Sequence, residues 1–534
     1  MCGILMYHNG SKKENSSHEQ FSLQFEGAEE NTFENVSSVL KTKNVDDIFI
    51  NECSYIVSRG PNFSGFESIN NGKTLLLSSV LSLRSPFTKQ PIKNERFIIQ
   101  YNGELYNSEI DANCNDTKFI NDKLLDIENK NVNKDLIDEE IFKLIRSLKG
   151  EFAYNIIDTF TGKNYFGRDS IGKRSLSYCF INQTKELIVT SCNGSSIDSP
   201  YKENFINCLN NVIYIYDSEN NKVIDSNLIN KGDYRVNETV IETEEEVEKL
   251  EITLYKKLKE SCYKRLTSIH PLNSKPSDKI NVGVLFSGGL DCSLILILLC
   301  EIIMENNLIN HFTLNLLNVA FENPRTSMQP DDVPDRKLGI KSSSEIMEKF
   351  QDVDIKFHKI NVSSDEYLKY KPVVLDLMYP KDTEMDLSIA IAFYFASKQL
   401  PLGDKKSSVL FSGLGADELF GGYHKFNNKS NEELIPELNK QINNIHDRNL
   451  NRDDKVIAIN GVELRYPFLD EDVVEWSTSS VPLNLKRNKT ILRNIARNML
   501  SFRDISLEPK RAIQFGSKSA KMFDSKIKGT DKSS

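Results

Sequence analysis

The same short pattern occurs twice in the second half of the chain: an apolar strand that runs directly into a Ser-Gly turn. It covers residues 282–289 and 408–415. Further apolar runs at 313–320 and 355–360 alternate with helical patterns, which is typical of a parallel sheet covered by helices. Because parallel strands end at one edge of their sheet, both turns are expected at the carboxyl edge, where α/β proteins bind ligands. We therefore predict an α/β parallel-sheet domain over residues 245–520.

The first half consists of short β-like runs separated by polar turns, which predict an antiparallel sheet. Helical spacing at 116–125 and 138–148 adds helices, so we expect an α+β sandwich over residues 2–216. Residues 217–244 have no sustained apolar period and predict a linker, and the polar residues 521–534 predict a frayed tail. The β-like runs are 74–80, 96–100, 152–157, 186–190 and 212–216.

Composition limits the classes of function. The 67 Lys+Arg against 76 Asp+Glu give a net charge of -9, which argues against nucleic acid as the main partner. Nine scattered cysteines without a CxxC pair favour reduced thiols over a disulfide framework or a zinc ribbon. The longest apolar stretch ends at Glu301, far short of the roughly 20 residues of a membrane span, and no secretory signal is recognisable. We expect a cytoplasmic protein with no nucleic-acid or membrane partner, and a homodimer is left open.

Cys2 is a candidate nucleophile if Met1 is removed, because removal leaves a thiol and an α-amino group on one residue. An α-amino group has a pKa of about 7.7–8.0 and can accept the thiol proton near neutrality. Asn102-Gly103 could supply a side-chain amide and a backbone N–H to an oxyanion, although the pair is also typical of a hairpin turn. Taken alone, a Cys at this position is more often an ordinary small residue near a chain start.

Residues 287–293, Ser-Gly-Gly-Leu-Asp-Cys-Ser, lie after a buried strand and before an apolar helix. This is the layout of a pyrophosphate-binding loop, since glycines let backbone N–H groups approach an anion while hydroxyls and the helix N-terminus stabilise its charge. Asp291 would then hold Mg²⁺. A Gly-Gly turn before a helix is also a common structural element, and the strand–turn–Asp–helix context is what favours an ATP site.

Several segments together carry a resemblance to a known family. The first-half segments resemble the class II glutamine amidotransferases with an N-terminal-nucleophile fold, and the second-half segments look like the synthetase domain of glutamine-hydrolysing asparagine synthetases. The closest likeness is to the asparagine synthetase domain-containing proteins, it spans almost the whole chain, and the motifs occur in the family's order. The segments are 2–4, 58–65, 101–107, 115–117, 167–176, 287–293, 412–423, 452–455, 461–470 and 509–516.

The resemblance implies an amidotransferase sandwich followed by an ATP-pyrophosphatase-type synthetase domain. It further implies that glutamine is hydrolysed to ammonia in the first domain. ATP would adenylate the side-chain carboxylate of aspartate in the second, and ammonia would travel through an internal tunnel to displace AMP. The implied cofactors are ATP and Mg²⁺, and the implied partners are the small molecules glutamine, ATP and aspartate.

The resemblance also assigns roles to particular positions. The implied catalytic residues are Cys2, Asn102, Gly103, Lys510 and Arg511. The implied glutamine-binding residues are Arg59, Arg84, Asn102, Glu104 and Asp116. The implied ATP-binding residues are Leu285, Ser287, Gly288, Gly289, Asp291, Cys292, Ser293, Val319, Ser412 and Gly413. The implied metal ligands are Asp291 and Asp417, one on each Ser-Gly turn.

Four positions depart from the family's pattern. Leu81 stands where the family has an Arg for the glutamine carboxylate, with Arg84 three residues further on. Leu414 replaces a Glu that serves as a base toward ammonia, and Leu cannot accept a proton. Ser388 replaces a pyrophosphate-binding Arg, and Cys292 a Ser. Three hypotheses therefore stay open: an ATP-dependent amidotransferase, a silent relative acting as a scaffold or regulatory protein, and a glutaminase that serves another acceptor.

Overall fold

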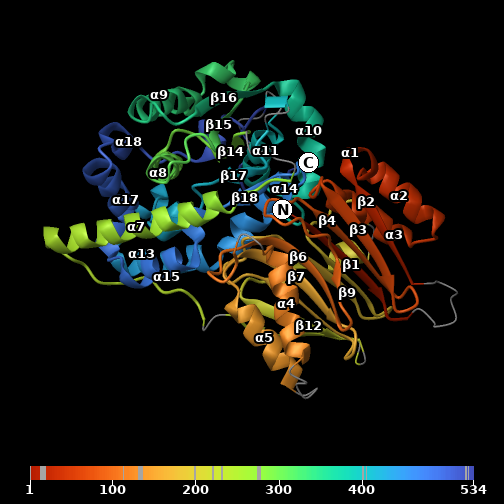
Figure 1. The fold of residues 1–534 in the computed structure, drawn as a ribbon. Coiled ribbons are helices and arrows are strands. Elements are labelled where there is room, and N and C mark those ends of the chain that lie inside the picture. The colour runs from red at the N-terminus through yellow and green to blue at the C-terminus, as the bar shows by residue number, and fades with distance from the viewer. Residues whose placement is uncertain are drawn as a thin grey trace.

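The computed structural model of the chain has two parts, a sandwich of antiparallel sheets and a domain built on a parallel sheet (Figure 1). In Figure 1 the sandwich carries the red-to-yellow colours and the second domain the green-to-blue ones. The structure describes residues 2–11, 20–111, 114–129, 136–197, 200–218, 220, 222–229, 232–272, 278–399, 402–403, 406–523, 526 and 528–533.

The sandwich holds two antiparallel sheets, one of seven strands and one of six. Its strands are β1 (Gly3–Asn9), β2 (Phe21–Glu26), β3 (Phe63–Ile69), β4 (Thr74–Val80), β5 (Ile92–Lys93), β6 (Phe97–Leu105), β7 (Gly150–Asp158), β8 (Lys163–Arg168), β9 (Ser177–Ile181), β10 (Glu186–Thr190), β11 (Phe205–Asn207), β12 (Val212–Asp217) and β13 (Lys222–Leu228). The strand orders are β11-β9-β10-β1-β4-β3-β2 and β13-β12-β8-β7-β6-β5.

Helices cover the outer face of each sheet (Figure 1). Those of the sandwich are α1 (Gly27–Glu30), α2 (Phe33–Thr42), α3 (Asp47–Val57), α4 (Asp116–Asn129), α5 (Ile137–Ser147) and α6 (Tyr201–Asn204). Because side chains alternate along a strand, β1 packs Ile4 and Met6 against the other sheet, and Leu5 and Tyr7 against α2 and α3. Burial on both faces makes β1 a fixed central strand, and it fixes the position of Cys2 just before it.

The second domain is built on a parallel sheet of five strands in the order β16-β15-β14-β17-β18. These strands are β14 (Ile280–Leu285), β15 (Phe312–Phe321), β16 (Ile355–Val362), β17 (Val409–Phe411) and β18 (Glu463–Arg465). Its helices are α7 (Glu244–Thr267), α8 (Leu290–Glu305), α9 (Pro334–Lys349), α10 (Ser364–Leu377), α11 (Glu384–Lys398), α12 (Ala416–Leu419), α13 (Asn431–Asn443), α14 (Asn451–Ala458), α15 (Glu471–Ser480), α16 (Leu483–Lys486), α17 (Thr490–Asn494), α18 (Arg503–Leu507) and α19 (Ile513–Gly516). The predicted alternation of strands and helices is confirmed.

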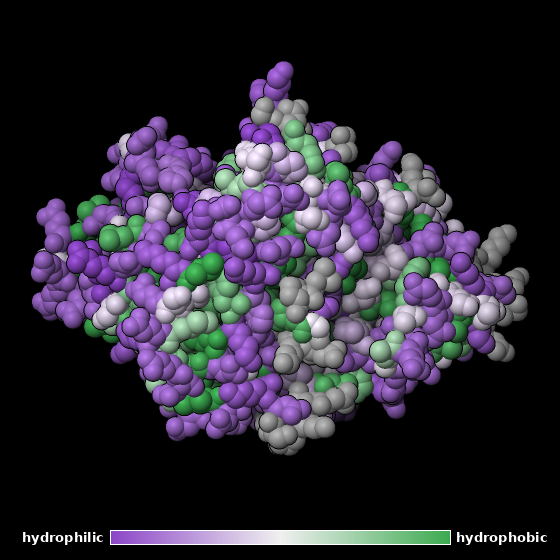
Figure 2. Space-filling model, turned by 90° about the horizontal axis from the view of Figure 1, so that it is seen from above, coloured by the Kyte–Doolittle hydropathy of each residue, from purple (hydrophilic) through white to green (hydrophobic). Residues whose placement is uncertain are grey.

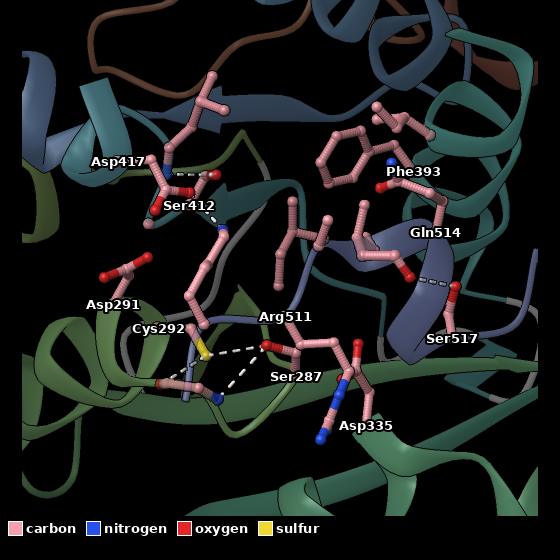
Figure 3. Close-up of a pocket in the computed structure, with 18 of the residues that line it drawn as sticks. Ser287, Asp291, Cys292, Asp335, Phe393, Ser412, Asp417, Arg511, Gln514 and Ser517 are labelled. Carbon is pink, nitrogen blue, oxygen red and sulfur yellow. Dashed lines mark hydrogen bonds and ion pairs between the residues drawn. The ribbon is translucent and has the colours of Figure 1, made fainter. Parts of the chain in front are cut away.

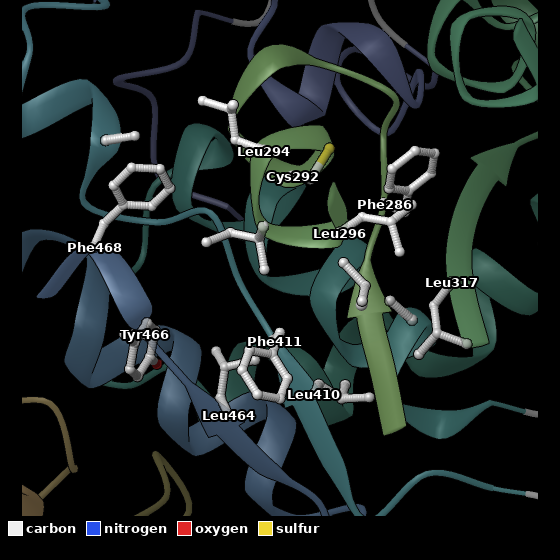
Figure 4. Close-up of a cluster of buried hydrophobic side chains, with 14 of the residues drawn as sticks. Phe286, Cys292, Leu294, Leu296, Leu317, Leu410, Phe411, Leu464, Tyr466 and Phe468 are labelled. Carbon is white, nitrogen blue, oxygen red and sulfur yellow. The ribbon is translucent and has the colours of Figure 1, made fainter. Parts of the chain in front are cut away.

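Helix α8 is apolar on nearly every side, as expected of a helix enclosed by protein. Figure 4 shows its side chains Leu294 and Leu296 above Phe411 of β17 and Leu464 of β18. Because this core lies directly under the Ser-Gly turns, it holds them in place. Outside the core, the face in Figure 2 is mainly hydrophilic, with separate small apolar patches. No helix in the described ranges is both long enough and apolar enough to cross a membrane.

The structure differs from the sequence-based expectation at two boundaries. Strand β13 lies inside the segment 217–244 expected to be a linker, and it pairs with β12, so the second sheet reaches Leu228. The described end of the expected frayed tail folds back onto the start of α11, where the backbone N–H groups of Glu384 and Met385 donate to the carbonyls of Asp531 (2.9 Å) and Gly529 (3.0 Å). The first N–H groups of a helix lack partners inside it, so the tail satisfies this terminus.

Buried ion pairs join the two domains. Arg59 of the sandwich contacts Asp454 at 2.9 Å, and Arg265 of α7 contacts Glu151 of the sandwich at 2.8 Å. Arg174 donates to the carbonyl of Leu464 at 2.6 Å. Removing one partner of a buried pair leaves an uncompensated charge, typically at a cost of about 3–5 kcal/mol. The domains are therefore held in one arrangement, with β18 and α14 directly against the sandwich.

The same interface predicts a pH dependence of stability. Burial, together with the negative charge of Asp376, raises the pKa of Glu52 to about 8 from its ordinary value of 4.5, although Lys455 opposes this. Between pH 4.5 and 8 the unfolded chain has lost a proton that the folded chain keeps, so the free energy of unfolding falls as pH rises through this window. Glu52→Gln is expected to flatten this dependence in urea unfolding at pH 5.5 and pH 8. Glu95→Gln, at an exposed position, is the control and should leave the pH dependence as it is in wild type. An equal change in the free energy of unfolding between the two pH values for wild type and Glu52→Gln would contradict the assignment.

Two candidate active sites

The first candidate site surrounds Cys2. The backbone N of Cys2 donates to Oδ1 of Asn102 at 2.9 Å, which joins the start of β1 to β6 of the facing sheet. The side-chain Nδ2 of Asn102 is buried and, within the described structure, has no hydrogen-bond partner. At Gly103 a Cβ would lie 2.1 Å from the carbonyl oxygen of Glu151, so only glycine fits. Cys2 thus lies beside a free amide donor, as an oxyanion hole requires.

The thiol of Cys2 is enclosed. Burial raises the pKa of this thiol, so activation requires a base close to the sulfur. Gln90 donates from Nε2 to the sulfur at 3.7 Å and to Thr117 at 3.2 Å, while its Oε1 accepts from the backbone N of Tyr101 at 2.7 Å. Sequence analysis missed Gln90, because it lies on no recognisable motif.

Arg84, Glu104 and Asp116 form a buried charge cluster in the same site. The guanidinium of Arg84 contacts Glu104 at 2.6 Å and Asp116 at 2.8 Å. Burial alone would lower the pKa of Arg84, but the two carboxylates outweigh it and raise this pKa. The cavity beside Cys2, lined by all three residues, measures only about 30 Å³.

Arg59, the other arginine expected to bind glutamine, lies elsewhere. It is fully buried, donates from Nε to the carbonyl of Cys2 at 3.4 Å, and contacts Asp454 through Nη2. It is not among the described residues that line the cavity beside Cys2. Its place in the structure is therefore that of a link between the first residue of the site and the second domain.

The second candidate site is a pocket of about 430 Å³ at the carboxyl edge of the parallel sheet. Its walls include the turns after β14 and β17, as the topology predicts. Figure 3 shows Asp291 and Asp417 together on one side, with Asp335 and Arg511 on the other. Of the residues assigned to ATP, all line this pocket except two, Gly288 and Ser293.

The positions of these two residues are explained by packing within the protein. Gly288 has φ +82°, and a Cβ there would lie 2.6 Å from the backbone N of Gly339, so its lack of a side chain lets α9 approach the loop. Ser293 is fully buried in the first turn of α8. The residues on either side of them form the part of the loop that lines the pocket.

Two lysines neutralise the acidic pair of the pocket. Lys489 contacts Asp291 and Asp417, each at 2.6 Å, and Lys510 forms an ion pair with the second oxygen of Asp417. Burial by itself would raise the pKa of Asp417, but the two ammonium groups outweigh it and lower this pKa. Sequence analysis identified Lys510 but missed Lys489.

The acidic pair also fits a divalent cation. Oδ1 of Asp291 is buried and has no hydrogen-bond partner among the described residues. Two carboxylates suffice for Mg²⁺ when nucleotide phosphates supply further ligands. The described ranges contain no cluster of three or more His, Cys, Asp or Glu that could hold a metal without such help.

Asp335 and Leu414 also line this pocket. Burial raises the pKa of Asp335 to about 7, although Arg511, at 3.8 Å, opposes the shift. Leu414 follows Ser412 and Gly413, and its backbone N donates to the hydroxyl of Ser412 at 3.2 Å. Ser388 is buried and does not appear among the described wall residues.

Comparison with known proteins agrees with this division. Residues 276–439 and 431–528 match the family model of asparagine synthase, and residues 79–195 that of the glutamine amidotransferase domain. An asparagine synthetase domain-containing protein of Saccharomyces cerevisiae is 46% identical, covering 99% of this chain and 98% of the relative. One from Drosophila melanogaster is 28% identical, over 91% and 95%. A putative asparagine synthetase [glutamine-hydrolyzing] of Methanocaldococcus jannaschii is 27% identical, over 86% of both chains.

Proposed function

Because the chain belongs to the asparagine synthetase domain-containing proteins, we propose that it activates a carboxylate with ATP and amidates it with ammonia from glutamine. The pocket of about 430 Å³ at the carboxyl edge of the parallel sheet carries this proposal. It combines two Ser-Gly turns, an acidic pair and two lysines in one place.

The second domain would hold the nucleotide through its own charges. The N-terminus of α8 and Gly289, its N-cap, line the pocket, where backbone N–H groups and the helix dipole favour phosphate. Lys489 and Lys510 would move from the aspartates to the phosphate oxygens as these arrive. Mg²⁺, held by Asp291 and Asp417, would neutralise the pyrophosphate that leaves.

An acidic acceptor, aspartate above all, is supported by further cations in the wall of this pocket. Lys381, Arg448 and Arg452 line it in addition to Lys489 and Lys510. Arg452 is engaged by Asp386 and Asp453. Nη1 of Arg448 is buried without a hydrogen-bond partner in the described structure, and is therefore available for a carboxylate.

The first domain would release the ammonia. After Met1 is removed, the sulfur of Cys2 attacks the amide carbon of glutamine, and its proton passes to the α-amino group. Asn102 Nδ2 and the backbone N–H of Gly103 donate to the oxyanion. The α-ammonium then protonates the amide nitrogen, which departs as ammonia, and water hydrolyses the remaining thioester to glutamate and the free thiol.

ATP–pyrophosphate exchange in the presence of aspartate tests this proposal. Purified protein should catalyse exchange, and Asp417→Asn should lower the rate about 10²–10³-fold, because one carboxylate oxygen that would hold the cation is lost. Asp365→Asn, at an exposed position in the first turn of α10, is the control. Absence of aspartate-dependent exchange in wild type would contradict the proposed activity.

A second candidate, a nucleotide-binding relative that amidates poorly, is favoured by Leu414. This side chain lies in the pocket wall where a base toward ammonia is expected. Such a protein would bind ATP and perform exchange without forming much amide. The Leu414 variants in the Discussion separate the two candidates.

A further inference from the structure

The charge cluster beside Cys2 has the composition of a site for an amino acid ammonium group, but it is already filled. Glu104 and Asp116 converge on one cation, and that cation is the guanidinium of Arg84. Arg84 also donates to the carbonyl of Leu105 at 2.9 Å. The second oxygen of Glu104 contacts Arg465 at 3.2 Å. Both carboxylates are therefore engaged before any ligand arrives.

The space that remains does not admit glutamine. A cavity of about 30 Å³ has room for about one or two water molecules. Of the three charged side chains, Arg84 is the most exposed, at 12% against 3% for Glu104 and 5% for Asp116. It is thus the member of the cluster that can leave toward solvent with the least rearrangement.

Electrostatics give the same result. Among the described wall residues of this cavity, Arg84 has the one cationic side chain, and Leu81 offers no charge to a carboxylate. An incoming ammonium would meet a guanidinium of like charge at close range in a buried site, where repulsion is poorly screened. We propose that Arg84 occupies the ammonium subsite of the glutamine pocket and thereby controls which amide donors reach Cys2.

This inference rests on the proposed hydrolysis of glutamine. The alternative role of Arg84 predicts the opposite effect. If Arg84 instead swings out to bind the carboxylate of glutamine, its removal weakens binding. If Arg84 fills the subsite, its removal opens the pocket, and the apparent affinity rises by the inverse of the fraction of molecules that were open. The sign of the effect therefore separates the two roles.

Alkylation of Cys2, read by peptide mass, measures the opening in the full-length protein without Met1. The probes are 6-diazo-5-oxo-L-norleucine, which carries the ammonium and carboxylate of glutamine, and iodoacetamide, which is small and neutral. Arg84→Ala is expected to react with the glutamine analogue at least about tenfold faster than wild type. Arg84→Lys, a smaller cation, should lie between them and serves if the alanine variant does not fold. Arg96→Ala, which removes the Arg96–Asp158 ion pair in the same domain, should react like wild type.

Several outcomes would overturn the role of Arg84. Among them are equal rates in wild type and Arg84→Ala, a slower reaction of Arg84→Ala, and a uniform increase with both probes that Arg96→Ala shares. Reaction of Cys2 with iodoacetamide but never with the glutamine analogue, in any variant, would overturn the proposed glutamine hydrolysis as well. A wild type that already reacts rapidly with the analogue would leave that function standing and remove only the role of Arg84.

Discussion

Cys2→Ala is expected to abolish glutamine hydrolysis, with a loss of about 10³-fold or more, because Cys2 is the one thiol among the described residues that line this cavity. The backbone N of Cys2 contacts Asn102, and Gly103 lines the same cavity. The base for the sulfur is an α-amino group that exists only after Met1 is removed. The measurement is glutamate release from glutamine. It is made in the Arg84→Ala background as well as in wild type, so that a closed pocket does not hide the effect.

Cys114→Ala is the matched control for this prediction. Cys114 is a partly buried thiol of the same domain, and it is not among the described residues that line the cavity beside Cys2. Its loss should leave glutamate release unchanged. Intact-mass data showing Met1 retained on protein that still hydrolyses glutamine would contradict the mechanism, as would activity in Cys2→Ala.

Local sequence patterns predicted the strands and helices better than they predicted which charged side chains lie together. The apolar runs before the two Ser-Gly turns became β14 and β17, and the parallel sheet placed both turns at one pocket. Lys489 could not be predicted, since it is 198 residues from Asp291 and stands in no phosphate-binding motif. Only the packing of the chain brings this ammonium between the two carboxylates.

The contacts of Arg84 could not be predicted from the sequence for a similar reason. The sequence places a cation near the departure at Leu81, which suggested a ligand for the glutamine carboxylate. The structure instead directs it onto Glu104 and Asp116, from a different strand and from the start of a helix. Strand β13 was missed because, among the described strands, it lies at the edge of its sheet with β12 as its one partner, and such a strand needs little apolar pattern.

Leu414→Glu is expected to increase amide formation by about 10²–10⁴-fold, the range typical of general-base assistance. Ammonia that attacks an acyl adenylate must lose a proton, and Leu414 cannot accept one. The side chain lies in the wall of the pocket on the turn after β17, three residues before Asp417. Glu418 does not replace it, because it is buried, accepts hydrogen bonds from Tyr423 and Asn449, and lies outside the described pocket wall.

The assay for this prediction uses ammonium chloride as the nitrogen source, so that the state of the glutamine pocket does not enter. Asparagine formation should rise in Leu414→Glu while ATP–pyrophosphate exchange stays near the wild-type rate. Leu414→Gln, which has the same shape without a base, is the control and should not gain activity. Since Lys489 and Lys510 line the same pocket as the new carboxylate, these cations should favour its ionised form at neutral pH, as a base must be. Efficient asparagine synthesis by the wild type, or an equal gain in Leu414→Gln, would show that the base is supplied from another position.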